Sequence, residues 1–186
     1  MTKDTPVQVR EHDGSRYASH EDFQTIFNED VKELYQLSLL LTRDPAKAER
    51  CFVTGLEDCV SENNVFREWA RSWAKRTIVQ NAIRELKPRP SQPNSRLSRA
   101  KYSDIEQYAK DSGEHFEIDA LLRLADFDRF VFVMSVLENY SEHDCALLLG
   151  CSAGDIRDGR TRALKELADS HRVEPSDNQL VVQEKK

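Results

Sequence analysis

Cations recur every fourth residue in the middle of the chain, and others lie close by: Arg67, Arg71 and Lys75, then Arg76 and Arg84. In a helix this spacing places the first three on one face. Trp69 and Trp73 lie in the same segment. Cations bind phosphates, so the pattern is typical of a polyanion site. Both tryptophans also fit the apolar face of the same helix, and for Trp73 we favour core packing.

The charge distribution supports a polyanion site in this segment. The chain has 186 residues and a formal net charge of −6. Residues 66–101 hold ten basic and two acidic residues, whereas residues 1–65 carry a net −6 and residues 102–186 a net −8. A compact basic segment within an acidic chain indicates a local contact with a polyanion. A solvated basic helix face followed by a basic linker accounts for the same charge equally well.

A second group of cations lies near the C-terminus: Arg157, Arg160, Arg162 and Lys165. Before them, Ser141 opens a short helix that Gly150 closes, and Ser152 opens a longer helix with Asp155 as its capping partner. Ala146 is small enough for two helices to cross closely. The pattern predicts a helix-turn-helix, whose second helix enters the major groove of DNA. An ordinary pair of antiparallel helices is the alternative.

Patterns for catalysis or metal binding do not appear in the sequence. There is no glycine-rich phosphate loop, no nucleophile elbow and no cluster of ligand residues. The cysteines form no Cys-x-x-Cys pair and fit a reduced protein core: Cys51, Cys59, Cys145 and Cys151. We therefore expect no enzyme activity, no metal, no cofactor and no small-molecule substrate.

The chain contains neither an apolar run long enough for a membrane span nor an N-terminal signal pattern. These observations predict a cytoplasmic protein with no membrane span.

Helical periodicity dominates and almost no strand pattern is found, so we predict an all-α protein of two small helical domains joined by a flexible linker. The predicted parts are a polar arm over 1–22, a helical domain over 23–86, a linker over 87–117, a second helical domain over 118–170 and a polar tail over 171–186. Within them we expect helices near 23–41, 46–60, 65–86, 103–110, 118–137, 141–149 and 152–170. Asp44 and Pro45 predict the start of the second helix, and Pro88 and Pro90 the end of the third.

Apolar spacing predicts which helix faces are buried. In the helix over 46–60 the expected core face is Cys51/Phe52, Leu56 and Cys59/Val60, which leaves Val53 and Thr54 partly exposed. In the helix over 65–86 it is Phe66, Trp69/Ala70, Trp73/Ala74, Thr77/Ile78 and Asn81/Ala82.

Two groups of residues, in order along the chain, carry a family resemblance. The first comprises Leu34-Tyr35-Gln36-Leu37, the segment from Thr42 to Glu49, and Trp69 to Arg84. The second comprises Arg129-Phe130-Val131-Phe132, Ala146, Leu149-Gly150, Gly154, Ile156 and Arg162-Ala163. Residues 28–86 and 119–168 thereby resemble regions 2 and 4 of the sigma factors of bacterial RNA polymerase, in the extracytoplasmic-function (ECF) group.

The resemblance implies a transcription-initiation protein with RNA polymerase core and promoter DNA as partners, and an anti-sigma protein as an inhibitor. For polymerase binding it implies Asp44, Glu49, Arg50, Val53, Thr54 and Glu57. For the melted promoter strand it implies Asn63, Asn64, Arg67, Trp69, Arg71, Lys75, Arg76 and Arg84. For duplex DNA it implies Ser152, Arg157, Arg160, Arg162 and Lys165.

The chain departs from the family pattern at both contact surfaces. Val53 and Thr54 stand where the family carries Gln and Glu, and Asp155, Asp158 and Gly159 stand where it tends to have Thr, Ser and a basic residue. Over 152–170, the acidic residues balance the four basic ones. We therefore predict weak polymerase binding and weak phosphate binding by the last helix. A sigma-like regulator that acts through protein–protein binding, with weakened polymerase or DNA contacts, is the alternative function.

Overall fold

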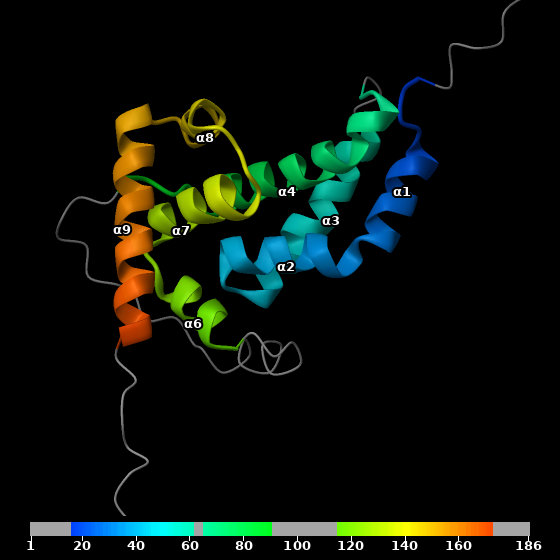
Figure 1. Cartoon of the computed structure of the whole chain (residues 1–186). Coiled ribbons are helices and arrows are strands. Elements are labelled where there is room, and N and C mark those ends of the chain that lie inside the picture. The colour runs from blue at the N-terminus through cyan, green and yellow to red at the C-terminus, as the bar shows by residue number, and fades with distance from the viewer. Residues whose placement is uncertain (1–15, 62–64, 91–114, 173–186) are drawn as a thin grey trace, which may run out of the picture. The chain divides into compact units, whose positions relative to one another are not determined.

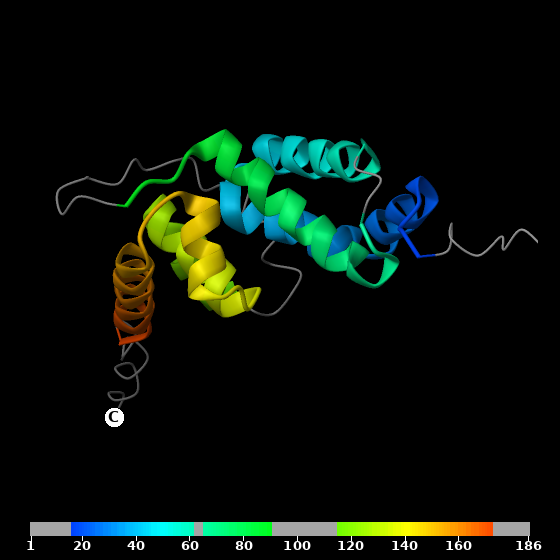
Figure 2. The same cartoon turned by 90° about the horizontal axis from the view of Figure 1, so that it is seen from above.

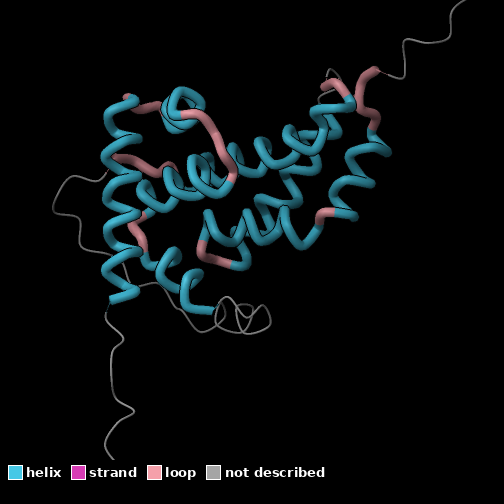
Figure 3. The backbone as a smooth tube through the Cα atoms, viewed as in Figure 1, coloured by secondary structure: helices cyan, strands magenta, loops and turns pink. Residues whose placement is uncertain are grey.

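The computed structural model describes residues 16–61, 65–90 and 115–172. All regular elements in these ranges are helical (Figures 1 and 3), which confirms the all-α prediction. The chain divides into two compact units, Met1–Glu85 and Leu86–Lys186. The predicted domain boundaries and their sigma-like assignment stay predictions. The predicted helix over 103–110 and most of the arm, linker and tail lie outside the described residues.

Unit 1 is formed by α1 (His20–Glu29), α2 (Val31–Thr42), α3 (Pro45–Ser61), the 3₁₀ turn η1 (Arg67–Trp69) and α4 (Ala70–Leu86). Helix α1 begins three residues before the predicted start. Ser19 and Asp22 form a capping box there, in which the Ser19 Oγ accepts from the Asp22 backbone N at 3.2 Å and the Asp22 carboxylate accepts from the Ser19 backbone N at 2.7 Å. The single helix predicted over 23–41 is wrong, because Asp30 ends α1 and begins α2.

The break between α2 and α3 is where the sequence predicts it. Arg43 adopts the left-handed conformation with φ of 57°, and the Asp44 carboxylate accepts a hydrogen bond from the Lys47 backbone N at 3.0 Å. Helix α4 ends at Leu86, before the predicted prolines. Its start, however, differs from the prediction. Residues 65 and 66 are not helical, and an isolated antiparallel bridge joins Phe66 to Tyr17.

The core of unit 1 is built on α3, which packs on α1 and α2 and also passes close to α4 (Figure 2). Gly55 permits this approach, because a Cβ at this position would lie 3.0 Å from Cγ1 of the buried Ile78. Cys59 also contacts Thr77, with its Sγ 3.5 Å from the threonine hydroxyl. The buried residues of α3 are therefore Ala48, Cys51, Gly55 and Cys59, whereas Phe52, Leu56 and Val60 of the predicted core face are half-buried.

Unit 2 is formed by α6 (His115–Arg123), α7 (Asp126–Phe132), the π-helical turn η2 (Val133–Leu137), α8 (Glu142–Leu149) and α9 (Ala153–Arg172). The single helix predicted over 118–137 is wrong, because the chain breaks at Leu124 and Ala125. The fully buried Arg129 stabilises the break. Its guanidinium donates to the Leu124 carbonyl at 3.0 Å and to the Asp126 carboxylate at 2.8 Å.

No helix in the described ranges is both long enough and apolar enough to cross a membrane.

Candidate nucleic-acid interface

The predicted cationic stripe of unit 1 faces carboxylates of α1 and α2. The Arg67 guanidinium donates to Asp22 at 3.0 Å and 3.2 Å. Arg71 donates to Glu29 at 2.5 Å and also to Asp30. The Lys75 Nζ donates to Glu33 at 2.6 Å. We name these three cations with their four carboxylates the charge ladder.

The charge ladder lies at the surface. The side chains of Arg67 and Arg71 are 53% and 55% exposed, and that of Lys75 is 30% exposed. Exposed pairs of this kind contribute about 0–1 kcal/mol each, because water and salt screen the charges. The stripe is therefore neutralised by its own unit, yet it remains accessible to a stronger anion.

The other predicted cations of unit 1 do not extend the stripe as one surface. Arg84 donates to Asp58 of α3 at 2.7 Å, and Asn81 donates to the same carboxylate at 3.1 Å. Arg76 is half-buried and makes no ion pair within the described part of the chain. Asn63 and Asn64 lie outside the described residues.

Aromatic rings stack beside the first cation of the ladder. Tyr17 stacks on Phe66 with ring centroids 4.9 Å apart, and Phe66 meets Trp69 edge to face at 5.3 Å. Trp69 is 58% exposed, so its predicted place in the core is wrong. The 3₁₀ turn explains the difference, because it takes Trp69 out of the register of the α4 core face. Tyr17 was not predicted, since its partner lies 49 residues away in a segment predicted to be helical.

Trp73, unlike Trp69, packs partly into the core. Its side chain is half-buried, and its Nε1 is buried with no hydrogen-bond partner among the described residues. This burial agrees with the core packing favoured for Trp73 from the sequence. Of the two tryptophans, Trp69 therefore offers the ring that a base could stack on.

In unit 2, helices α8 and α9 are joined by a short turn with the predicted caps. The Ser141 Oγ accepts from the Asp144 backbone N at 3.0 Å, and Gly150 has φ of 64°. The Ser152 Oγ accepts from the Asp155 backbone N at 3.1 Å, while the Asp155 carboxylate accepts from the Ser152 backbone N at 2.9 Å. These observations confirm the predicted roles of Gly150 and of the Ser152–Asp155 capping box.

Helix α9 approaches α7 closely at Gly159, where the sequence indicates only the loss of a basic residue. A Cβ at Gly159 would lie 3.0 Å from a ring carbon of Phe127 on α7 and 3.3 Å from the Asp128 carboxylate. Ala146, the predicted crossing residue, is half-buried. Ile156 of α9 and Cys145 of α8 are fully buried, and the two helices pack on each other.

The cations of α9 are also paired, but with acidic residues of earlier helices. Arg157 donates to Glu142 of α8 at 2.5 Å, and the Arg160 guanidinium lies 3.9 Å from the same carboxylate. Arg162 binds Asp128 of α7 through two hydrogen bonds of 2.7 Å and 3.0 Å. The charge balance predicted within 152–170 does not include these partners, because both carboxylates lie outside that range. Ser152 and Lys165 are exposed.

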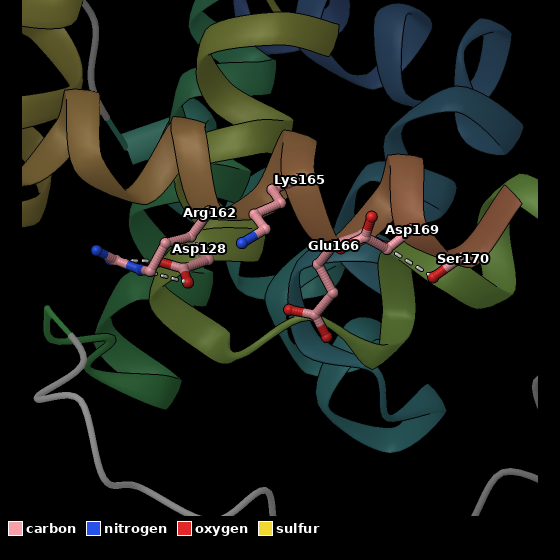
Figure 4. A pocket seen from close by; sticks show the side chains of 6 residues that line it. All are labelled: Asp128, Arg162, Lys165, Glu166, Asp169 and Ser170. Atoms are coloured by element: carbon pink, nitrogen blue, oxygen red, sulfur yellow. Dashed lines mark hydrogen bonds and ion pairs between the residues drawn. The ribbon is translucent and has the colours of Figure 1, made fainter. Parts of the chain in front are cut away.

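The Arg162–Asp128 pair borders a pocket of about 490 Å³ in unit 2 (Figure 4). Its lining residues are Asp128, Arg162, Lys165, Glu166, Asp169 and Ser170. Burial raises the pKa of Glu166, and the nearby Asp128 carboxylate raises it further. Two cations and three carboxylates line this pocket, so its charges do not favour an anionic ligand.

The residues implied for polymerase binding lie on and just before α3. Val53 is 47% exposed, as predicted, and Thr54 is half-buried. Glu49 and Glu57 are exposed. The other two serve the unit itself: Asp44 caps α3, and Arg50 donates to Glu85 of α4 at 2.8 Å.

Metal-ligating side chains form no cluster of three or more within the described ranges. Cys51, Cys59 and Cys145 are buried, and burial raises the pKa of Cys51 and of Cys145 to about 11.

No protein-family model matches this chain, and no curated protein matches its sequence.

Proposed function

We propose that the chain is a sigma-like transcription-initiation protein that acts without catalysis in the cytoplasm. In this proposal unit 1 binds RNA polymerase core through α3 and the melted promoter strand through η1 and α4. Unit 2 acts as a helix-turn-helix that places α9 on duplex DNA. The observation that carries the proposal is the cationic stripe of α4 beside the exposed ring of Trp69.

The arrangement of these groups suits a single strand. Phosphates are bound by a line of cations, and bases stack on aromatic rings with little regard to sequence. Arg67 adjoins the Phe66–Trp69 ring pair, so one strand could contact both kinds of group at once. Unit 2 supports the proposal less strongly, because Arg157 and Arg160 share the Glu142 carboxylate and Arg162 is tied to Asp128.

Purified bacterial core polymerase tests the proposal directly. We expect the chain to co-elute with core enzyme, about ten- to a hundredfold more weakly than an ordinary ECF factor binds. This expectation follows because Val53 and Thr54 offer fewer hydrogen bonds than Gln and Glu, and each bond lost to a charged group costs about 1.5–3 kcal/mol.

The double substitution Val53→Gln/Thr54→Glu should then strengthen binding. Leu164→Gln, at a 50% exposed position on α9, is a control for general surface change. Tight binding by the wild type that the double substitution leaves unchanged would show that polymerase is contacted elsewhere. Complete failure to bind core enzyme would contradict the proposal.

A regulator that binds protein partners alone is the second candidate, and the pairing of the cations supports it. The cations of η1 and α4 named above, except Arg76, and three of the four on α9 have carboxylate partners in their own unit. Stable binding to core polymerase without measurable affinity for single-stranded or duplex DNA at about 50 mM salt would favour this candidate.

A further inference from the structure

The charge ladder matches acidic and basic residues in the same order along two segments of unit 1. Asp22, near the start of α1, meets Arg67 of η1. Glu29 and Asp30, at the end of α1, meet Arg71 one turn further along. Glu33, in the first turn of α2, meets Lys75 of α4. Successive rungs on the basic side are four residues apart, or about 6 Å along a helix axis.

We propose that the acidic side of the charge ladder is a built-in mask that competes with nucleic acid for the cations of α4. The choice of nucleic acid as the competing ligand rests on the proposed function. A single strand binds only by displacing Glu29, Asp30 and Glu33 from Arg71 and Lys75. Any event that neutralises or removes those carboxylates raises the affinity of unit 1 for polyanions.

Exposure makes the mask removable at the rungs beyond Asp22. The Glu29 and Glu33 side chains are 55% and 61% exposed, so each can turn into water without leaving a buried charge unpaired. Asp30 is the N-cap residue of α2 but makes no capping hydrogen bond with its side chain. Its carboxylate is therefore not required to begin the helix.

The Asp22 rung is more firmly held. Its carboxylate also accepts hydrogen bonds from the Ser19 backbone N and hydroxyl, at 2.7 Å and 2.9 Å. These bonds lower the pKa of Asp22, and Arg67 lowers it further. Asp22 thus keeps its charge and its place, and the mask opens from the Glu33 end.

The test compares two double variants that change net charge equally. Glu29→Gln/Glu33→Gln removes carboxylates from the charge ladder. Glu49→Gln/Glu57→Gln removes two exposed carboxylates from α3 that have no ion-pair partner in the described ranges. Binding of a 20-nucleotide oligothymidylate is measured by fluorescence anisotropy at about 50 mM salt, and circular dichroism checks that each variant is folded.

We expect the ladder variant to bind about three- to tenfold more tightly than the wild type, because each released exposed pair is worth a fraction of a tenfold change. Adding Asp30→Asn should tighten binding again. The α3 variant should change affinity by less than about twofold, since neither carboxylate pairs with a ladder cation and exposed charges are screened by salt. Introducing Arg71→Gln/Lys75→Gln into the ladder variant should abolish the gain.

Equal affinities for the two double variants would overturn the mask, as would a gain that survives loss of Arg71 and Lys75. Absence of binding by every variant would overturn it as well, because released cations would then have no affinity for a polyanion. None of these outcomes depends on polymerase, so failure of the core-binding experiment leaves this test intact.

Discussion

The ion pairs of α4 and the Arg162–Asp128 pair of α9 differ in how far their carboxylates are exposed. In unit 1, Arg71 and its partner Glu29 are both 55% exposed. In unit 2, Arg162 is 43% exposed, but its partner Asp128 is only 5% exposed. An exposed carboxylate can return to water, whereas a buried one that loses its cation keeps an uncompensated charge. The α4 pairs are therefore exchangeable contacts, and the Arg162–Asp128 pair is part of the packing of unit 2.

The largest expected effect comes from breaking the buried pair. Asp128→Ala should destabilise unit 2 by about 2–3 kcal/mol, because α7 loses two charge-assisted hydrogen bonds to Arg162 of α9 together with the contacts of a buried side chain. Asp169→Ala, an exposed position on α9, is the control and should stay within about 0.5 kcal/mol. Urea unfolding followed by circular dichroism gives both values, and equal stabilities for the two variants would remove the distinction between the units.

A smaller effect is expected at Gly159, where α9 approaches α7 beside Asp128. Gly159→Ala should cost about 1–2 kcal/mol, because its Cβ meets the buried Phe127 ring and crowding exceeds the gain in helix propensity. Gly154→Ala on the same helix meets only the Ser152 hydroxyl, at 3.4 Å, and should be neutral or stabilising. Thermal unfolding of both variants measures the difference, and a stabilising Gly159→Ala would place the crossing elsewhere.

Salt should separate the two kinds of pair more sharply. Arg71→Gln should cost less than about 1 kcal/mol at 50 mM salt and nothing measurable at 0.5 M, because exposed pairs are screened. The cost of Asp128→Ala should remain at both concentrations. Fluorescence of Trp69 and Trp73 follows the unfolding of unit 1, where both tryptophans lie. A salt-independent cost for Arg71→Gln would show that the charge ladder is structural.

The smallest expected effect concerns the capping boxes. One begins α1 in unit 1 and the other begins α9 in unit 2. Hydrogen bonds from Ser19 and Ser152 lower the pKa of Asp22 and Asp155 respectively. A lowered pKa in the folded state means that the stabilisation is present above about pH 4 and is lost as the pH falls through the folded pKa. Helix content should therefore decrease slightly below pH 4. Asp22→Asn and Asp155→Asn should each remove part of that acid transition, and an unchanged transition in both variants would contradict the assignment.

Local features of this fold could be predicted from the sequence because short-range chemistry determines them. Asp44 before Pro45, Gly150 after an apolar helix, and Ser152 with Asp155 all lie within one helical turn of what they cap. The break before α7 could not be predicted in the same way. It depends on the buried guanidinium of Arg129 in α7, which donates back to the Leu124 carbonyl.

The candidate site was predicted less completely, for the same reason. The spacing of Arg67, Arg71 and Lys75 identified the cationic stripe, but their carboxylates lie 41 to 45 residues away along the chain. Exposure of Trp69 depends on a 3₁₀ turn that periodicity alone does not distinguish from an α-helix. Whether the cations of the stripe are paired therefore depends on carboxylates that are distant in sequence.

The proposed nucleic-acid site is tested most directly by comparing the cations of α4 with those of α9. The affinity for a single strand is measured over a range of salt concentrations for Arg71→Gln/Lys75→Gln/Arg76→Gln and, separately, for Arg160→Ala. We predict that the triple substitution weakens binding and flattens the salt dependence by about 0.7 for each lost phosphate contact, whereas Arg160→Ala has little effect. An unchanged slope in the triple variant, with binding abolished by Arg160→Ala, would contradict the account.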